Sequence, residues 1–578
     1  MRVSAAPRGF RPRRRRLGWL AGAVALWALL VRATPAAAQS EPCPLGRVSR
    51  IEIRNYSLFA PADITGRRFS WALGLANSLH IRTRADYLER QMLLEEGECY
   101  DPEALEASVR YLRELDFIAR VQAEPRQVAD STWAIDVQTW DEWSTSASVY
   151  FDVEGELQIQ GFYVTEVNAL GRGLRLSFRH RAFRERNDNS VTLASTRFLG
   201  SATQASVAAG TTRTGRYFRQ DFTHPLQSET SRLYFLTHLQ LEDREQSYLT
   251  GDEDGVSHVL LPLNEKAVSL VLKRRSGVPG ALTLFGGELQ VLRRTLDGPV
   301  RQVIAYDFRG ARAAPDSIAA RLRPQESPDS WIRLGATVGL RRIRFTSGKG
   351  LDLVSGVQNV ALGSELTLTV GRTLGTWGSS STDTYGSLDG FVSGAAGALL
   401  ANTSLHAEGR FLDFRKADAS RWRDLRLSGR SLLYVQPGAA PAQAFVLGAR
   451  FNFRDNTDQP YQVALGGEQG VRAYREDQVP TASTFVAFAE ERINLPWFHP
   501  AVDLGLTAFV DHGRGWADDI PFGQNTGWRT AVGGGIRLGF PAGSGSVTRV
   551  EVAWPVGNGA QGRGPVIRTY FSPVETSR

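Results

Sequence analysis

The sequence predicts a mainly β protein: a C-terminal transmembrane antiparallel β-barrel of about 16 strands, preceded by one small α+β domain. Three observations predict this class. Stretches that alternate apolar and polar residues recur throughout residues 141–578. Glycine accounts for 57 of the 578 residues, which is typical of a chain with many strands and turns. The first residues have the composition of an export signal.

The N-terminal segment, residues 1–38, contains eight arginines and no acidic residue. An apolar run covers residues 17–31, and the small residues that follow predict cleavage after Ala38. We interpret the segment as a secretory signal peptide; an N-terminal membrane anchor and a twin-arginine signal are the alternatives. Beyond residue 38 there is no run of 18 apolar residues, so the sequence predicts no transmembrane helix.

The net charge of the whole chain, +8, equals the charge of this segment. The chain that remains after cleavage is therefore close to neutral. The basic balance is consequently no evidence for a nucleic-acid partner, and we expect none.

Residues 46–140 predict a small domain in the order strand, helix, helix, strand, strand. The first helix is expected to start at a Thr83 cap and to stop at Gly97. In the second helix Asp101 is the expected cap, and Pro102 occupies the first helical position. The expected strands are residues 48–53, 117–124 and 131–140.

The chain has two cysteines, Cys43 and Cys99. In an oxidising compartment they predict one disulfide between the start of the mature chain and the first domain. Two unpaired thiols are the alternative.

The barrel prediction, residues 141–578, depends on strands such as "WIRLGATVGLR" (331–341) and "FVLGARFNFR" (445–454). In each, apolar side chains share one face while arginines and glycines share the other, which matches an apolar wall facing lipid and a polar lumen. A soluble sandwich or propeller is the alternative. It is disfavoured because the polar faces carry arginine and glycine, and because no blade-like repeat occurs. At about 27 residues per strand and loop, the region predicts about 16 strands.

The stretch "GGEQGVRAYRED" (466–477) interrupts this pattern. A turn explains Gly466 and Gly467, but not Arg472. An arginine inside a barrel needs a carboxylate, and a guanidinium can donate two parallel hydrogen bonds to one. Asp511 is the first candidate partner, and Glu490 is the second. We expect such a clamp to hold the loop against the barrel wall.

Several motifs resemble those of the BamA/TamA family of outer-membrane barrels. "VRAY" (471–474) resembles the family's VRGF/Y loop motif, and "FVDHG" (509–513) resembles its F-x-D-x-G strand motif. "RVEVAWPV" (549–556) resembles the penultimate strand, "EVNALGRGLRL" (166–176) the entry to the barrel, and "FTHPL" (222–226) the end of an early strand. Residues 46–140 look like a POTRA domain. The resemblance covers nearly the whole mature chain.

The resemblance implies roles for particular residues. Arg472 would be the loop arginine, within the loop motif of Val471 and Tyr474 that follows Gly466 and Gly467. Asp511 would be its partner, within the strand motif of Phe509 and Gly513. Ala473 stands where the family favours glycine. The first and last barrel strands would form a seam, with "GPVIRTYFS" (564–572) as the closing strand.

The resemblance also implies a function and partners. The POTRA-like domain would lie in the periplasm and receive unfolded or secreted client polypeptides, by adding a strand at an edge placed at residues 131–138. The barrel would contact outer-membrane lipid, and periplasmic chaperones or accessory proteins are further expected partners. A two-partner-type secretion transporter and a plain outer-membrane channel or structural barrel are the alternatives. Only one POTRA-like domain is visible, whereas the main assembly insertases have several.

An enzymatic role is not predicted. The eight histidines are scattered, and the sequence contains no H-E-x-x-H, C-x-x-C or G-x-S-x-G motif. His512 follows Asp511 directly, but neighbours on a strand face opposite ways and would not meet. The sequence therefore predicts no cofactor and no metal site.

Overall fold

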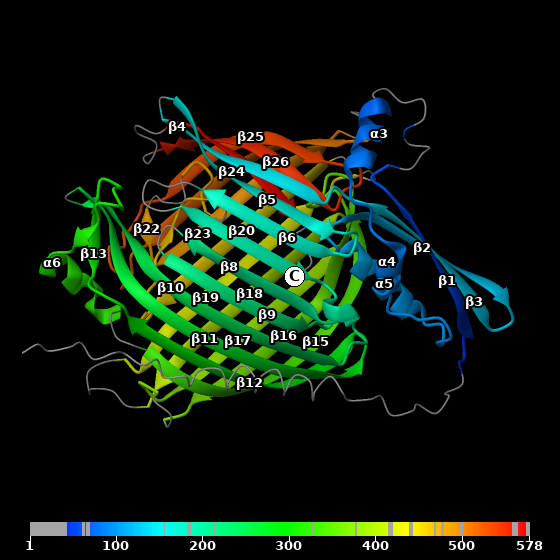
Figure 1. The fold of residues 1–578 in the computed structure, drawn as a ribbon, viewed down its shortest axis with the longest axis horizontal. Helices are drawn as coiled ribbons and strands as arrows, with labels where there is room; N and C mark the ends of the chain where they lie inside the picture. Colours follow the sequence, from blue (N-terminus) through cyan, green and yellow to red (C-terminus); the bar gives the residue numbers. More distant parts are fainter. Residues whose placement is uncertain are drawn as a thin grey trace, which may run out of the picture.

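The computed structural model describes residues 43–573, except 60–63, 65–69, 155, 182–186, 213–214, 254, 326–328, 376–378, 414–419, 439–442, 468–469, 475–478, 496–500 and 558–563. The predicted signal peptide lies outside the described residues. Two parts follow each other along the chain: a small domain with a three-stranded sheet, and a large antiparallel barrel (Figure 1).

The small domain is built on a sheet with the strand order β1-β3-β2. Strand β3 lies in the centre, parallel to β1 and antiparallel to β2. Leu88, Leu112, Ile118, Ile135 and Val137 belong to its buried core. The elements are β1 (Arg47–Tyr56), α3 (Ser70–Leu79), α4 (Ala85–Glu89), α5 (Pro102–Arg113), β2 (Ile118–Ala129) and β3 (Thr132–Asp141).

The helices differ in part from the prediction. Helix α3 was not predicted, and the Thr83 cap is wrong. The Thr83 N–H donates to Asp141 (2.7 Å) and its hydroxyl accepts from Asn168 (2.8 Å), so the Thr83 side chain is engaged outside the helix. Helix α4 covers only Ala85–Glu89 and ends well before Gly97, so the predicted stop at Gly97 is wrong as well. The Asp101 cap of α5 is confirmed, because its Oδ1 accepts from the Glu103 N–H at 2.9 Å.

The position of the sheet edges corrects a second expectation. Of the predicted edge, residues 131–138, all but Ser131 fall in β3, which is paired on both sides and offers no edge. The segment that contains Cys99 covers part of β1, since Arg47 and Cys99 form an antiparallel bridge. The edges of the sheet are therefore β2 and the part of β1 beyond its first residues.

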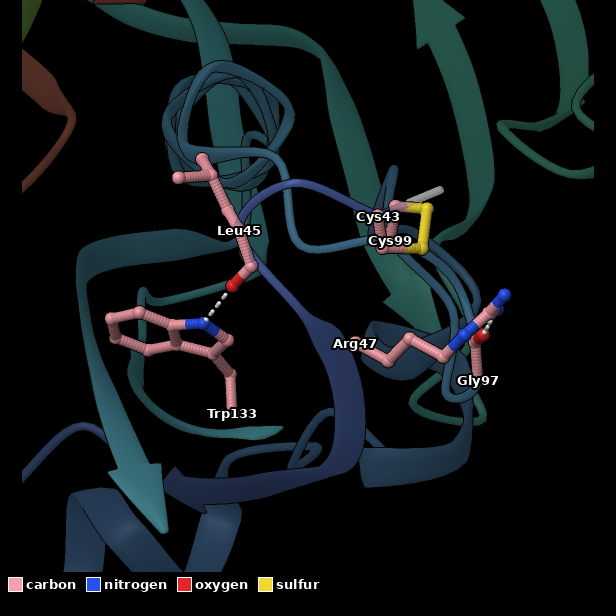
Figure 2. The surroundings of a disulfide bond; sticks show 6 residues. All are labelled: Cys43, Leu45, Arg47, Gly97, Cys99 and Trp133. Carbon is pink, nitrogen blue, oxygen red and sulfur yellow. Dashed lines mark hydrogen bonds between the residues drawn. A yellow bond between two sulfur atoms is a disulfide. The ribbon is translucent and has the colours of Figure 1, made fainter. Parts of the chain in front are cut away.

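Cys43 and Cys99 form the disulfide, with their Cα atoms 5.2 Å apart and a sequence separation of 56 residues. Two hydrogen bonds hold the surrounding segments (Figure 2). Trp133 Nε1 donates to the Leu45 carbonyl at 2.6 Å, and Arg47 Nη1 donates to the Gly97 carbonyl at 2.8 Å. The bridge thus fixes the start of the described chain beside the sheet.

Replacing Cys99 by serine is expected to destabilise this domain by about 2–4 kcal/mol, because the unfolded chain regains the freedom of a long loop. Limited proteolysis of the full chain in detergent, with and without denaturant, measures the effect. The gel bands of the protease-resistant barrel should be unchanged in the same samples. Equal protease resistance of the variant and the parent chain would contradict a stabilising role.

The barrel strands form one antiparallel sheet whose order places β27 next to β4. The wall consists of β4 (Thr145–Glu154), β5 (Glu156–Ala169), β6 (Leu174–Arg181), β7 (Asp188–Ser195), β8 (Gln204–Thr212), β9 (Gly215–His224), β10 (Leu233–Glu253), β11 (Val256–Val278), β12 (Ala281–Leu296), β15 (Asp329–Lys349), β16 (Val357–Thr373), β17 (Asp383–Ala396), β18 (Leu399–Leu412), β19 (Trp422–Val435), β20 (Gln443–Asp455), β23 (Ser483–Asn494), β24 (Asp503–Trp516), β25 (Arg529–Gly539), β26 (Ser546–Val556) and β27 (Val566–Pro573).

The described residues therefore give a wall of twenty strands rather than about 16. The short strands β13 (Arg301–Ile304) and β14 (Arg312–Ala313) are not counted, because they extend β11 beyond the point where β12 ends. The predicted number of strands was too small because the prediction assumed long connections between strands. Several hairpins are instead joined by only two residues, as between β11 and β12 or between β17 and β18.

The side chains of the wall alternate as predicted. On β15, Leu334, Val338 and Leu340 are 45–54% exposed on the outer face, while Arg333 and Thr337 are only 3% and 4% exposed on the inner face. An outer surface this apolar is unfavourable in water and matches contact with lipid. Among the described residues, no helix has the length and apolar character needed to cross a membrane.

The described residues of the small domain contact one rim of the barrel, which we call the POTRA rim; the opposite one is the far rim. Figure 1 shows α4 and α5 at one end of the barrel, and β13 and α6 (Asp316–Ala319) at the other. At the POTRA rim, Asn359 at the start of β16 accepts from Arg113 (2.8 Å) and donates to Glu114 (3.0 Å). Nearby, Glu142 accepts from the Gly545 N–H at 2.8 Å and from the Ser544 hydroxyl.

Candidate functional site: a buried arginine clamp in the lumen

The connection between β20 and β23 folds into the barrel from the far rim. The strands β21 (Val463–Ala464) and β22 (Pro480–Thr481) pair and form its neck. Leu465, Val471 and Tyr474 are fully buried against inner side chains of β23–β26. We call residues 465–474 the inner loop, although residues 468–469 are not described.

The glycines of the motif shape this loop. Gly467 has a φ of +98°, a conformation that favours glycine, and its N–H donates to the Tyr474 carbonyl at 2.9 Å. Gly466 forms a parallel bridge with Val471. A turn therefore does explain these glycines, and it presents Arg472 to the barrel wall.

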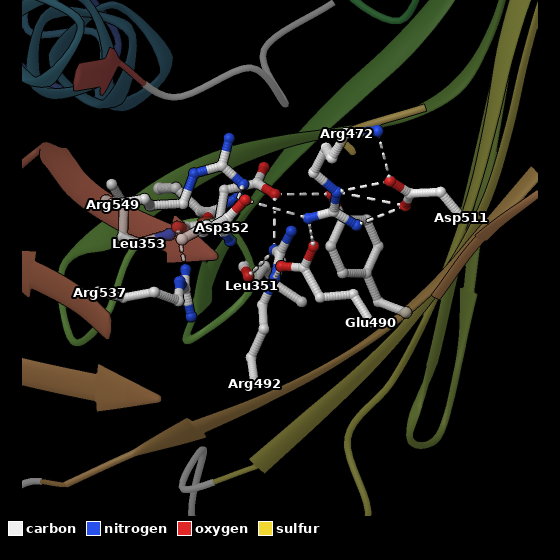
Figure 3. Close-up of polar contacts among 12 residues, drawn as sticks. Leu351, Asp352, Leu353, Arg472, Glu490, Arg492, Asp511, Arg537 and Arg549 are labelled. Carbon is white, nitrogen blue, oxygen red and sulfur yellow. Dashed lines mark hydrogen bonds and ion pairs between the residues drawn. The ribbon is translucent and has the colours of Figure 1, made fainter. Parts of the chain in front are cut away.

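Arg472 and Asp511 lie in direct contact (Figure 3). The guanidinium donates to Asp511 through Nη2 to Oδ1 at 2.7 Å and through Nε to Oδ2 at 2.9 Å. The backbone N–H of Arg472 adds a third bond to Oδ2 at 3.0 Å. Both side chains are almost fully buried, at 7% and 1% exposure. This is the two-bond geometry that a planar guanidinium allows.

Two further carboxylates surround the same guanidinium. Arg472 Nη1 lies 3.0 Å from Glu490 on β23 and 3.4 Å from Glu551 on β26. The ring of Phe509 lies below it, with its centroid 3.4 Å from Arg472 Cζ. Glu490 is thus an additional partner and not an alternative to Asp511. One loop side chain thereby connects strands β23, β24 and β26.

The charged network continues toward the POTRA rim (Figure 3). Arg492 Nε donates to Glu490 at 2.7 Å, and Arg492 Nη1 lies 3.1 Å from Asp352. Asp352 belongs to the turn between β15 and β16, which folds inward and also receives a hydrogen bond from Tyr434 at 2.8 Å. Arg537 donates to the Asp352 carbonyl. The inner loop and this turn therefore enter from opposite rims and meet through Glu490 and Arg492.

The last strand also holds the inner loop. Arg568 on β27 donates to the Arg472 carbonyl at 3.0 Å and to the Tyr474 carbonyl at 2.6 Å. The loop consequently contacts the last strand of the barrel, which lies next to β4 in the strand order.

Gly513 of the strand motif lies where the inner loop packs against β24. A Cβ atom there would lie 2.7 Å from Val471 Cγ2 and 3.0 Å from the Phe485 carbonyl oxygen. Only glycine lets the loop approach the wall this closely. The strand motif thus combines a ring under the guanidinium, a carboxylate beside it and an open position for Val471.

Replacing Gly513 by alanine is expected to destabilise the barrel by about 1–3 kcal/mol through overpacking. The temperature at which the heat-modifiable band unfolds on a gel measures this. Gly394→Ala is the matched control, because a Cβ atom at Gly394 on β17 would meet nothing within 4 Å. If both variants unfolded at the temperature of the parent chain, the packing argument would be wrong.

The sequence did not identify Glu551, Arg492, Asp352, Arg537 or Arg568. For Arg492 a signal existed, because it lies two residues after Glu490 on the same face of one strand. For Asp352 there was none, since a turn has no periodicity that reveals inward folding. His512 lies apart from the clamp, as expected: it is exposed on the outer face and stacks on Trp528 at 4.6 Å. In the described part of the chain no group of three or more His, Cys, Asp or Glu side chains is arranged to hold a metal ion.

A family model matches part of the N-terminal region. Residues 78–154 match the family model "POTRA: Surface antigen variable number repeat". No curated protein matches the chain. Among solved structures, CdiB from Escherichia coli is 14% identical with a TM-score of 0.43, over 94% of this chain and 92% of that one. BamA from Haemophilus ducreyi lacking POTRA domains 1-3 is 10% identical with a TM-score of 0.39, over 91% and 85%. CdiB from Acinetobacter baumannii is 10% identical with a TM-score of 0.40, over 91% and 74%.

The chain is thus a POTRA-containing β-barrel, with the POTRA domain ahead of a wall that is apolar outside and charged inside. This is the domain combination of the BamA/TamA type that the sequence motifs predict, and the fold prediction is confirmed at this level.

Proposed function

We propose that the chain is an outer-membrane assembly or translocation factor whose POTRA domain receives polypeptides in the periplasm. The observation that carries this proposal is the inner loop, held by Arg472 to β23, β24 and β26 and by Arg568 to β27. A passive channel needs no loop that spans the strands beside the seam. A factor that opens its seam or lumen needs an element that holds these strands closed in the resting state.

The POTRA domain supports the same function. Strand β2 is one edge of its sheet, and the second half of β2, residues 124–129, is exposed along its length. A client in extended conformation can hydrogen-bond to such an edge through its main chain, largely independently of its sequence. Unfolded or secreted polypeptides are therefore the proposed partners, together with outer-membrane lipid around the barrel. No catalytic step is proposed.

Photocrosslinking in living cells tests the proposal. A photoreactive residue replaces Gln127 on β2, Thr139 on the central strand β3 as a buried control, or Ile567 on the outer face of β27. Unfolded outer-membrane barrel proteins captured at both Gln127 and Ile567, but not at Thr139, are the expected result. A single large exoprotein would identify a secretion transporter instead. If no polypeptide were captured at either site, a plain channel or structural barrel would remain as the interpretation, and the proposal would be overturned.

A further inference from the structure

Helix α3 of the small domain has one apolar face that no part of the chain covers. The helix carries no charged residue, and Trp71, Leu75 and Leu79 are 72%, 51% and 66% exposed. Residues four apart lie on the same side of a helix, so these three side chains form one surface, which we call the α3 face. Three large apolar side chains exposed on one short helix are unfavourable in water and indicate an interaction surface.

The opposite side of α3 packs against the barrel at the POTRA rim. Leu73 is buried in an apolar cluster with Phe59 and with Ala501, which lies between β23 and β24. Phe59 also contacts Phe540, the residue after β25, with ring centroids 5.7 Å apart. Figure 1 shows α3 beside the end of the barrel wall and away from α5. The helix is therefore held at the outside of the rim while the α3 face points away from the protein.

This contact lies at the margin of the lipid-facing wall. Leu506 on β24 and Ile536 on β25 lie directly opposite each other and are exposed on the outer face. Phe540 comes four residues after Ile536, so alternation directs it to the same face, about 13 Å closer to the rim. Phe540 is itself still exposed in part. The apolar outer surface thus continues from the wall to the segment that holds α3, and the bilayer around the wall is the occupant that this continuity indicates.

The polar side chains of α3 agree with this occupant. After Ser70 the helix has two of them, and both are hydrogen-bonded within the protein. The Asn77 amide accepts from the Phe59 N–H at 3.1 Å and donates to the Phe59 carbonyl at 2.9 Å. The Ser78 hydroxyl donates to the Leu75 carbonyl at 2.8 Å. Neither side chain requires water as a partner, which suits a position where water is scarce.

Two connections join α3 to the sheet of the small domain. The bonds of Asn77 reach Phe59, three residues beyond the end of β1 at Tyr56. At the other end of the helix, His80 Nε2 lies 3.0 Å from Asp141 Oδ2 at the end of β3, and both side chains are buried. The depth of α3 in a bilayer would therefore set the height and tilt of the whole sheet.

We propose that the α3 face lies in the headgroup region of the bilayer, in the leaflet on the POTRA side, and anchors the small domain to the membrane. The ten residues of α3 extend over about 15 Å, too little to cross the hydrocarbon core, so the helix lies along the surface. Tryptophan favours this depth, and the leucines reach the upper part of the acyl chains. The proposal rests on the transmembrane barrel and is independent of what the barrel passes.

Fluorescence quenching in liposomes tests the proposal. Leu75→Cys is labelled with the environment-sensitive fluorophore NBD in the oxidised full chain, where Cys43 and Cys99 are joined and the added thiol is free to react. The labelled chain is reconstituted into phosphatidylcholine that carries a nitroxide either near the headgroup or near the end of the acyl chain. We expect the shallow nitroxide to quench the Leu75 probe severalfold more strongly than the deep one.

Two probes at other positions make the quenching specific. Val128→Cys on β2 is an exposed apolar position of the same domain, and its probe should not be quenched by either lipid. Leu506→Cys on the outer face of β24 should be quenched, which shows that the barrel is inserted. If the Leu506 probe were quenched but the Leu75 probe behaved like the Val128 probe, the α3 face would contact water or another polypeptide, and the proposal would be overturned. Stronger quenching of the Leu75 probe by the deep nitroxide would overturn it too.

A charge on the α3 face gives a second readout. Leu75→Glu leaves the buried side of the helix intact, and it should raise hydrogen exchange of residues 70–79 severalfold in liposomes, because a carboxylate is unfavourable in the membrane. Val128→Glu should leave this exchange unchanged. Exchange in Leu75→Glu equal to that of the parent chain would contradict the anchor.

The photocrosslinking experiment above is independent of these measurements. A quenched Leu75 probe without captured clients would overturn the proposed function and leave the membrane anchor standing. Captured clients with an unquenched Leu75 probe would do the reverse.

Discussion

Arg472→Ala is expected to lower the free energy of unfolding of the barrel by about 3–5 kcal/mol. The substitution leaves Asp511, Glu490 and Glu551 buried around an empty position, at 1–2% side-chain exposure. Glu490 keeps its ion pair with Arg492 and Glu551 keeps Arg549, so Asp511 is the carboxylate that loses its cation. An uncompensated buried carboxylate is far less favourable than an ion pair. The measurement is the unfolding temperature of the heat-modifiable band, together with denaturant unfolding in detergent.

Two further variants distinguish the clamp from a general charge effect. Arg472→Lys keeps the charge but cannot form the parallel bonds to Asp511. Its free energy of unfolding should therefore lie between that of Arg472→Ala and that of the parent chain. Arg90→Ala breaks an exposed ion pair with Asp86 in the POTRA domain and should cost less than about 1 kcal/mol. If Arg472→Ala lost no more unfolding free energy than Arg90→Ala, the clamp would not stabilise the barrel.

Arg472→Ala should also affect function, because the inner loop would no longer hold the strands beside the seam. The surface level of client proteins, measured by protease accessibility on intact cells, is expected to change. An unchanged client level with a normally folded barrel would restrict the clamp to a structural role.

Arg492→Ala is expected to have the second large effect: it should lower the free energy of unfolding of the barrel by about 3 kcal/mol. Arg492 is the cation between Glu490 and Asp352, with distances of 2.7 and 3.1 Å. Without it, Asp352 loses its contact with β23, and the turn over residues 350–356 should open more often. Hydrogen exchange of that turn should increase severalfold, while exchange in α5 and in the disulfide region stays unchanged.

The double variant Arg472→Ala/Arg492→Ala separates the two halves of the network. Both arginines contact Glu490, so their effects should not be additive. We expect a coupling energy of about 0.5–3 kcal/mol between them. Strict additivity would mean that the inner loop and the inward turn are held independently.

Periodicity allowed much of this fold to be predicted. The outward leucines of β15 and the inward arginines follow directly from period-two alternation in the sequence. The pair Arg472–Asp511 was also predictable, because a charged loop residue in a barrel needs a carboxylate and the motifs supply one. These predictions succeed because they depend on local pattern and on the cost of burying charge.

Other features depend on long-range arrangement and could not be predicted. The inward turn at Asp352 is joined to Arg492 across 140 residues of sequence. The central position of β3 results from its parallel pairing with β1, which no local pattern in residues 131–140 reveals. The number of strands depends on the lengths of the connections, and the shortest of these carry little sequence signal.

An even count of strands has a topological consequence for the chain ends. Each strand reverses direction, so a chain that enters at one mouth of the barrel must leave at the same mouth after twenty passes. The end of β27 at Pro573 and the start of β4 at Thr145 therefore lie at the same mouth, on the side of the POTRA domain. Under the proposed function, a polypeptide delivered there would reach β4 and β27 together, without first crossing the bilayer.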